Sequence, residues 1–277
     1  MLKNALVLVA DTASSAVARR YAISHAKKAE ADIAGLAGID FSHIEDRMLG
    51  RAGTSAYRID LGNTLRKQAA GIRQRMHDVF QAECRENHIL FNWLSFEGDP
   101  VDTVQLAAET RDLIVAGHDT GFCGEARQPV AQLLGKLLIA CPRPVIVCPD
   151  EMPAGNEILI AYDGSPSAMR AVQMFALGGI GQDGPICVTS IDADQETATR
   201  RTVGAAAYLR GHGYKVTENP ITSRVHPAEV LRIEVADRKV GLLVMGAYGH
   251  RGLHEIFFGS TTSSLVNTPP CVLFFYH

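Results

Sequence analysis

Glycine and serine residues near the C-terminus have the types and the spacing that suit phosphate binding. Gly246 and Gly249 follow an apolar run at 242–245, and after nine intervening residues Gly259 stands directly before Ser260. A buried strand that runs out into a glycine-rich loop lets the backbone approach an anion, and the first N–H groups of a following helix point at it. Glycines after a strand also form plain turns. The Gly-Ser pair at the start of the next helix favours a phosphate-binding loop over a simple turn.

Basic side chains lie in the loop between these glycines. Arg251 carries a planar guanidinium that can bind a phosphate through two hydrogen bonds, and a position on a solvated loop is the alternative. His250 and His254 are four residues apart, as metal ligands often are. Because no third ligand is near them in the sequence, exposed loop histidines are the better interpretation, and we expect no metal site.

The elements that must position these residues occur twice along the chain. An apolar strand that ends on aspartate is expected at 6–11 and again at 158–163, each followed by a helical stretch. Ser165 is placed to cap the second of these helices, with Pro166 in its first turn and Gly178-Gly179 at its end. Further matched segments are 98–104 with 225–231, 113–117 with 242–246 and 141–147 with 268–274.

This repeat predicts an α/β protein with two tandem domains, 1–149 and 156–277, each an open parallel sheet flanked by helices. About 25 extra residues in the first half are assigned to Phe41–Asp60, which is expected to form a loop or a lid. Ligands of such sheets bind at the carboxyl ends of the strands, where the strand order reverses. Asp163 and the loop after Gly246 are therefore expected to face one crevice.

The composition argues against several functions. The net charge is −3 with 21% charged residues, and no basic face or tail indicates nucleic acid or an anionic membrane. No apolar run approaches the ~20 residues that span a bilayer. The six cysteines include no C-x-x-C pair, so a reduced, cytoplasmic location is expected. The sequence also lacks a G-x-x-x-x-G-K-[ST] loop and a G-x-G-x-x-G motif after either first strand, which argues against a P-loop enzyme and a dinucleotide oxidoreductase.

Together these residues resemble the universal stress protein (UspA-type) family in its tandem two-domain form. The stretch M-G-A-Y-G-H-R-G-L-H-E-I-F-F-G-S at 245–260 fits the family signature G-2x-G-9x-G-S/T, and Asp163–Ser165 fits its usual Asp-Gly-Ser. The segment 226–231 fits the usual helix start, with His226 as a departure. The resemblance implies a five-stranded parallel sheet in the order 3-2-1-4-5, of the adenine nucleotide alpha-hydrolase-like type, that binds ATP.

The resemblance also assigns residues to the nucleotide. Asp163 would contact the adenosine part, and Ser190 and Ile191 at the end of the second strand would close on adenine. The loop and the helix start would hold ribose and phosphates. The full set is Asp163, Ser190, Ile191, Gly246, Gly249, His250, Arg251, Gly259, Ser260 and Thr261. ATP, with or without Mg²⁺, is the expected ligand, and AMP or cyclic AMP would fit the same cradle.

The first half departs from the signature. Asp11 is aligned with Asp163, but Thr12-Ala13 replaces Gly-Ser, and the loop 117–121 is one residue too long. The segment 130–133, which corresponds to Gly259-Ser260, lacks both glycine and hydroxyl. We expect the first half not to bind ATP in the usual way, and to be a structural partner or to hold another ligand.

The expected function is that of a nucleotide-binding regulator of the stress response without fast turnover. A slow ATPase or an enzyme that phosphorylates itself within 260–263 is the alternative, and a scaffold without nucleotide is a third. The resemblance implies an internal pseudo-dimer through the last strands, 144–148 and 271–276. We also expect a homodimer of chains and a regulatory protein partner, but neither nucleic acid nor a membrane as a partner.

Overall fold

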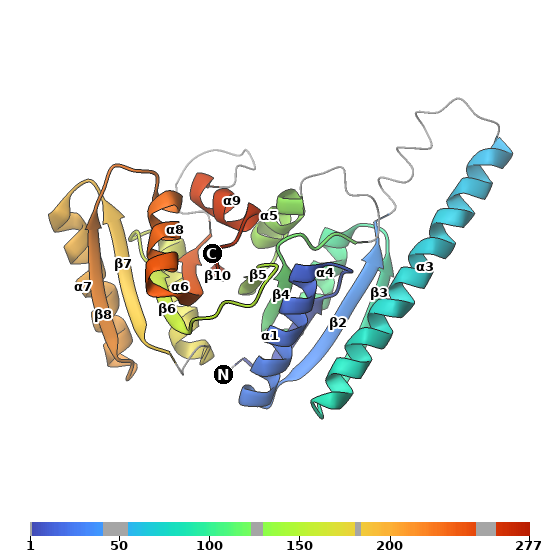
Figure 1. Ribbon diagram of the computed structural model, residues 1–277, viewed down its shortest axis with the longest axis horizontal. Helices are drawn as coiled ribbons and strands as arrows, with labels where there is room; N and C mark the ends of the chain where they lie inside the picture. The colour runs from blue at the N-terminus through green and yellow to red at the C-terminus, as the bar shows by residue number, and fades with distance from the viewer. Residues whose placement is uncertain (1, 41–54, 123–129, 181–183, 248–258) are drawn as a thin grey trace.

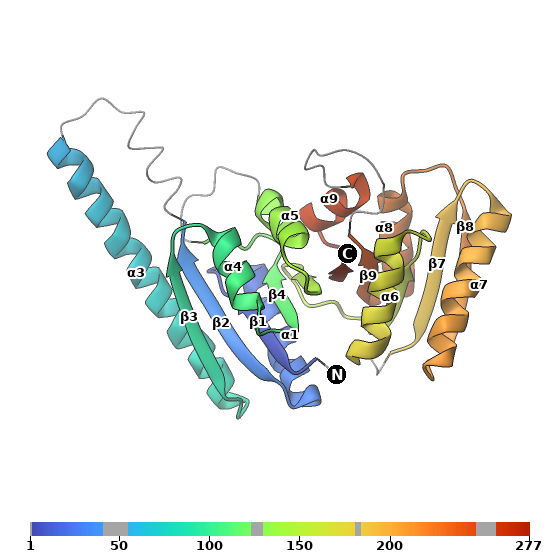
Figure 2. The same cartoon turned by 180° about the vertical axis from the view of Figure 1, so that it is seen from behind.

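The computed structural model describes residues 2–40, 55–122, 130–180, 184–247 and 259–277. In this part of the chain one continuous sheet runs through the molecule, with helices on both of its faces (Figure 1, Figure 2). The strands are β1 (Asn4–Leu8), β2 (Asp32–Ile39), β3 (Phe91–Glu97), β4 (Leu113–Gly117), β5 (Val145–Cys148), β6 (Glu157–Ala161), β7 (Ile186–Asp192), β8 (Val216–Thr222), β9 (Val240–Gly246) and β10 (Val272–Tyr276). The helices are α1 (Ala13–Ala29), α3 (Ser55–Glu86), α4 (Pro100–Ala108), α5 (Val130–Ala140), α6 (Pro166–Gly178), α7 (Gln195–Gly211), α8 (Pro227–Arg238) and α9 (Ser260–Asn267).

The order of the strands is β3-β2-β1-β4-β5-β10-β9-β6-β7-β8. Numbered within each half, this is the expected order 3-2-1-4-5 twice, and the paired strands of each half are parallel. The halves meet where β5 pairs antiparallel with β10, with Phe274 opposite Ile146. The α/β class with a mainly parallel sheet is confirmed, and the two closing strands pair with each other as expected.

Two apolar layers hold the helices to the sheet. One layer contains Val17, Phe80, Phe175 and Leu209, so α1, α3, α6 and α7 cover the same face. The other contains Val104, Leu134, Leu231 and Leu265, which places α4, α5, α8 and α9 on the opposite face. Because both faces of the sheet are covered, its central strands are apolar throughout rather than alternating.

The capping signals around α6 act as the sequence predicts. The hydroxyl oxygen of Ser165 accepts a hydrogen bond from the backbone N–H of Ala168, and Pro166 occupies the first turn. Gly179 ends the helix with a φ of 68°, a left-handed conformation that glycine adopts without strain.

The expectation of a loop at Phe41–Asp60 is partly wrong. Residues 55–60 belong to α3, which has 32 residues where its counterpart α7 has 17. Residues 41–54 lie outside the described part of the chain. Much of the extra length in the first half is therefore a long helix, which Phe80 anchors on the sheet next to Gly35.

A bidentate ion pair ties α3 to α1. Arg19, which is 8% exposed, donates from Nε and Nη2 to the Glu83 carboxylate at 2.7 and 3.1 Å. We expect Arg19→Met to lower the free energy of unfolding by about 2–3 kcal/mol, because it leaves a partly buried carboxylate unpaired. Urea unfolding measures this loss. The matched control is Arg73→Met, which breaks the more exposed single bond to Glu97 and should cost less than ~1 kcal/mol. Equal losses in the two variants would contradict a structural role for the Arg19 pair.

Candidate functional site

The candidate site lies at the carboxyl ends of β6, β7 and β9. Ala161 at the end of β6 pairs with Thr189 of β7 on one side and with Met245 of β9 on the other. Asp163 follows two residues later, and this register places it beside the ends of both neighbouring strands. β7, the next strand along the chain, pairs with one side of β6, and the later strand β9 pairs with the other side of β6. The strand order therefore reverses at β6, which makes this the switch point of the second half of the sheet.

The turn after β6 is built around Asp163. Its carboxylate accepts a hydrogen bond from the N–H of Ser165 at 2.9 Å, and Gly164 has a φ of 80°. The Arg201 side chain lies over this turn, with Nε 3.1 Å from the place where a Cβ on Gly164 would stand. Arg201 also donates to the Asp192 carboxylate at 2.6 Å. The N–H of Asp194 is the main cause that lowers the pKa of Asp192.

Arg201 and Asp192 are site residues that sequence reasoning missed. Asp192 ends β7, so an acidic residue directly after the second strand was an available signal. No spacing rule points to Arg201, because it reaches Asp192 from the second turn of α7. The pair brings a guanidinium to the edge of the sheet where Asp163 lies.

Ser190 is a buried hydroxyl whose hydrogen bonding is incomplete. It lies near the end of β7, is 1% exposed, and its Oγ has no hydrogen-bond partner among the described residues. The neighbouring Thr189, in contrast, donates to the carbonyl of Asn219 at 2.9 Å. A buried polar group without a partner costs free energy, so the Ser190 hydroxyl is a candidate partner for a ligand or water at this edge of the sheet. Ile191 follows it, half-buried, on the opposite face of β7.

Gly246 has a packing role that the sequence did not reveal. A Cβ at this position would lie 2.6 Å from the carbonyl carbon of Ser167 and would also clash with the backbone nitrogen of Ala168. The first turn of α6 therefore occupies the space that a side chain would need. The close approach of helix and strand is sufficient to explain this glycine.

The N-terminus of α9 lacks the side-chain cap that five other helices carry. Five helices carry a cap whose side chain accepts a backbone N–H, namely α1, α4, α6, α7 and α8. The N-cap of α9 is Gly259, which offers no such bond. Its first free N–H group belongs to Ser260, and the earliest internal bond runs from the Ser263 N–H to the Gly259 carbonyl. These open donors, with the positive end of the helix dipole, suit an anion.

His226 links the starts of α8 and α9. As N-cap of α8 it accepts the N–H of Ala228 at Nδ1, over 3.3 Å, and its Nε2 lies 2.9 Å from Ser260 Oγ. Because Nδ1 accepts, Nε2 carries the proton of the neutral ring and donates to Ser260. The serine hydroxyl keeps its own proton to donate to an anion. In this tautomer His226 is a positioning group and not a base for Ser260.

The structure describes only some of the remaining residues that the resemblance assigns to the nucleotide. Thr261 follows Ser260 in the first turn of α9, which lies between α5 and α8 in Figure 1 and Figure 2. Gly249, His250 and Arg251 lie outside the described residues. Asp163, Ser190, Ile191 and Gly246 share the edge formed by three adjacent strands, while Gly259 and Ser260 are joined to α8 through His226.

The alignment of Asp11 with Asp163 is wrong by one residue. The Val9 N–H donates to the carbonyl of Leu36, and in the second half the Tyr162 N–H donates to the carbonyl of Thr189. Val9 therefore corresponds to Tyr162. In the same way Thr12, the N-cap of α1, corresponds to Ser165, the N-cap of α6. Ala10 therefore stands where the second half has Asp163, and Asp11 takes the place of Gly164. The first half lacks the aspartate that the resemblance assigns to adenosine.

Aromatic rings fill the corresponding crevice of the first half. Phe96 and Phe122 are 9% and 5% exposed, and their rings meet edge to face with centroids 4.8 Å apart. The Phe96 ring lies so close to Gly38 that a Cβ there would be 2.5 Å from its Cζ. By strand register Gly38 is the counterpart of Ile191. The first half thus has apolar packing where the second half has Ser190 and Ile191.

Three titratable side chains lie together after β4 and β5 of the first half. Among the described residues, His118, Asp119 and Asp150 bring three possible ligand atoms within 4.8 Å of one another. Each has a partner in the protein: His118 Nε2 lies 3.2 Å from an Asp150 oxygen, and Asp119 accepts the hydroxyl of Ser14. This hydrogen bonding accounts for the cluster without an ion.

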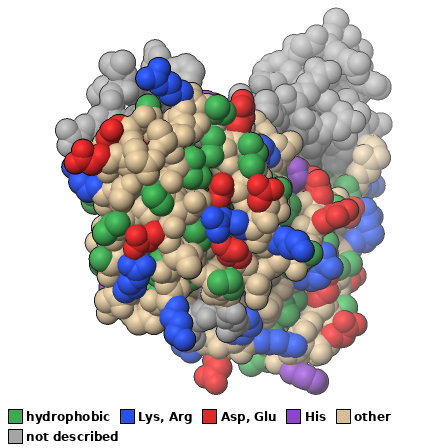
Figure 3. All heavy atoms as spheres, turned by 60° about the vertical axis from the view of Figure 1, so that its left-hand side comes forward, with side chains coloured by type: hydrophobic (Ala, Val, Ile, Leu, Met, Phe, Trp, Pro, Cys, Tyr) green, Lys and Arg blue, Asp and Glu red, His purple; other side chains and the backbone are tan. Residues whose placement is uncertain are grey.

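The surface over the second half carries charges of both signs. Figure 3 shows Lys and Arg side chains interspersed with Asp and Glu on this face, without a broad area of one charge. None of the helices that the structure describes has the length and apolar character to span a membrane.

The geometry defines an α/β protein with a group of polar residues at the switch point of its second half. The model of the Universal stress protein family matches residues 156–275. A universal stress protein of Synechocystis sp. is 26% identical over 157 residues, or 56% of this chain and 54% of the relative, so the chain spans about half of that relative's length. These findings point to the universal stress protein family, and residues 156–275 belong to it.

Solved structures agree in fold. A universal stress protein from Archaeoglobus fulgidus is 17% identical, with a TM-score of 0.69 over 99% of this chain and 95% of that one. A protein of unknown function from Pseudomonas aeruginosa PAO1 is also 17% identical, with a TM-score of 0.59 over 99% and 92%. Both likenesses cover nearly the whole chain, including the first half that the family model does not match.

Proposed function

We propose that the second half of this chain binds an adenine nucleotide, with ATP as the main ligand, and that the protein acts as a nucleotide-dependent regulator. The observation that carries the proposal is the uncapped N-terminus of α9 at the Gly259-Ser260 end of the G-2x-G-9x-G-S sequence. Its open N–H groups and the Ser260 hydroxyl would bind phosphate oxygens.

The other end of the ligand would lie at the carboxyl ends of β6 and β7. Asp163 is an acceptor for the ribose hydroxyls, and the unpartnered hydroxyl of Ser190 is available to the base. The Arg201 guanidinium, which is paired with Asp192, lies over the Asp163 turn at this end of the ligand. A domain of residues 156–277 would hold the site, and residues 1–149 would support it through the β5–β10 pairing.

Slow turnover is consistent with the groups around Ser260. His226 donates to the serine oxygen, so within the described part of the chain it does not act as a base that removes the serine proton, a step that self-phosphorylation at Ser260 would need. We propose a binding protein that signals its nucleotide state to a protein partner, rather than an enzyme that phosphorylates itself at Ser260.

Calorimetric titration of Mg-ATP into nucleotide-free protein tests the proposal, with AMP and cyclic AMP titrated in parallel. We expect one ATP site per chain, because the first half has Ala10 in place of Asp163 and rings of Phe96 and Phe122 in the crevice. Two sites per chain would contradict the proposed inactivity of the first half. Absence of binding by all three nucleotides would overturn the function itself.

A further inference from the structure

The helix α9, whose start carries the candidate phosphate site, is weak by itself. Its sequence is Ser-Thr-Thr-Ser-Ser-Leu-Val-Asn, and serine, threonine and valine are poor residues for a helix interior. A helix of eight residues is marginal in water even when its residues are better helix formers. Its N-cap, Gly259, supplies no side-chain bond, and Pro269-Pro270 follow its end. Contacts with other elements must therefore hold α9 in place.

The apolar core orients one side of α9. Thr262, Leu265 and Val266 are buried, and the last two share an apolar layer with Leu231 of α8. Apolar burial is non-directional. It turns this side of the helix toward the sheet, but it does not fix how far α9 is shifted along its own axis. That position needs directional contacts.

Arg232 of α8 makes such contacts at the C-terminal end of α9. Its Nη1 donates to the carbonyl of Thr268 at 2.7 Å, and its Nη2 donates to the carbonyl of Ser264 at 2.7 Å and to Thr268 Oγ1 at 2.9 Å. Carbonyl groups at the end of a helix lack internal donors, and a positive charge there is favourable to the helix dipole. The planar guanidinium can bond two carbonyls at once, which a lysine ammonium does not do in the same geometry.

The same helix α8 also contacts the other end of α9. His226 Nε2 lies 2.9 Å from Ser260 Oγ. His226 and Arg232 are six residues apart on α8, which corresponds to a rise of about 9 Å. Along α9, the step from Ser260 is about 6 Å to Ser264 and about 12 Å to Thr268. The similar spans allow α8 to hold α9 at its start and at its end, and the two helices pack against each other.

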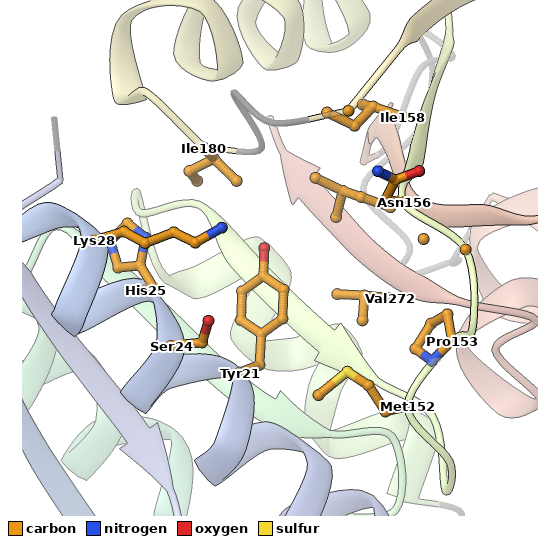
Figure 4. A pocket seen from close by; sticks show the side chains of 14 residues that line it. Tyr21, Ser24, His25, Lys28, Met152, Pro153, Asn156, Ile158, Ile180 and Val272 are labelled. Carbon is orange, nitrogen blue, oxygen red and sulfur yellow. The ribbon is translucent and has the colours of Figure 1, made fainter. Parts of the chain in front are cut away.

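We propose that Arg232 is a positioning residue for the nucleotide site. It fixes α9 along its axis, so that the open N–H groups at Ser260 face the phosphates. This role rests on the nucleotide binding proposed above. Arg232 would not touch the ligand, because its bonds to Thr268 lie about 12 Å along the helix from Ser260. The pocket in Figure 4 is also remote from it, since Tyr21 of α1 and Ile158 line that pocket on the opposite face of the sheet.

Calorimetric titration of ATP and of adenosine into wild-type and Arg232→Met protein tests this role. ATP should bind about tenfold more weakly to the variant, because only a fraction of the chains would keep α9 in the competent position. Adenosine lacks the phosphates and would be held at the ends of β6 and β7, so its affinity should be unchanged. Arg232→Lys keeps the charge without the fork and should show a smaller loss for ATP. This milder variant replaces Arg232→Met if that protein folds poorly.

The matched control is Arg238→Met on the same helix. Arg238 donates to Glu234 and Glu157 instead of to α9, so its loss should leave both affinities unchanged. Hydrogen exchange of the nucleotide-free proteins gives a second measurement, in which the amides of α9 should exchange faster in Arg232→Met than in the wild type or the control.

Equal ATP affinities in the wild type and the two Arg232 variants would overturn this role and leave the proposed function intact. Parallel losses of ATP and adenosine binding would also overturn it, because they would indicate a general loss of folding. Absence of ATP binding by the wild type would overturn the proposed function and this role with it.

Discussion

Replacement of Gly259 by glutamate is expected to abolish ATP binding while the protein stays folded. A Cβ at Gly259 has only Thr262 Oγ1 near it among the described atoms, at 3.9 Å, and the φ of −52° suits any residue. A carboxylate at this place would occupy the anion site and repel the phosphates, so we expect a loss of at least about 100-fold in affinity. Calorimetric titration with Mg-ATP measures the loss.

Thermal unfolding of the same variant separates binding from folding. An acidic side chain at a helix N-terminus is favourable to the helix dipole, so the melting temperature without nucleotide should be equal to or slightly above that of the wild type. Gly211→Glu is the matched control, because the Cβ position of this glycine on α7 is open too, with no atom within 4 Å. That control should bind ATP normally. ATP binding by Gly259→Glu with wild-type affinity would show that the phosphates lie elsewhere.

The parts of the fold that depend on local signals could be predicted from the sequence. The Ser165-Pro166 start and the Gly179 end of α6 are set by backbone chemistry within a few residues. The family resemblance implies the strand order 3-2-1-4-5, but the register that joins the strands depends on hydrogen bonds between distant segments and cannot be read from the sequence. For this reason the sequence pattern aligns Asp11 with Asp163, although hydrogen bonds to the neighbouring strand place Ala10 there.

The parts of the site that depend on distant contacts could not be predicted. Arg201 and His226 acquire their roles through Asp192 and Ser260, and no sequence spacing links these pairs. The rings that fill the first crevice likewise come from β3 and from the segment after β4. The sequence assigns the signature glycines together to phosphate binding, but in the structure Gly246 and Gly259 have different surroundings. The space at Gly259 is open, whereas at Gly246 a helix fills it.

This division leads to a second large effect, on Gly246. Gly246→Ala should lower the free energy of unfolding by about 3 kcal/mol, because the new Cβ would collide with the backbone of Ser167 and Ala168, which cannot rotate away. Urea unfolding measures the change through the shift of the midpoint at constant slope. The control Gly211→Ala, at an open helical position, should be neutral or stabilising by up to about 1 kcal/mol.

The first half contains a matched variant that tells packing from ligand contact. Gly117 lies against the backbone of Ser14 and Ser15, and a Cβ on Gly117 would be 2.7 Å from the carbonyl carbon of Ser14. This packing is equivalent to that of Gly246 against the backbone of Ser167 and Ala168. If packing is the reason for both glycines, Gly117→Ala should destabilise the chain by a similar amount, although its half is not expected to hold nucleotide. ATP binding by the folded fraction should then survive in Gly117→Ala. A Gly246→Ala protein with wild-type stability and no ATP binding would instead assign that glycine to the ligand, since a contact made only with bound phosphate adds nothing to the stability of the free chain.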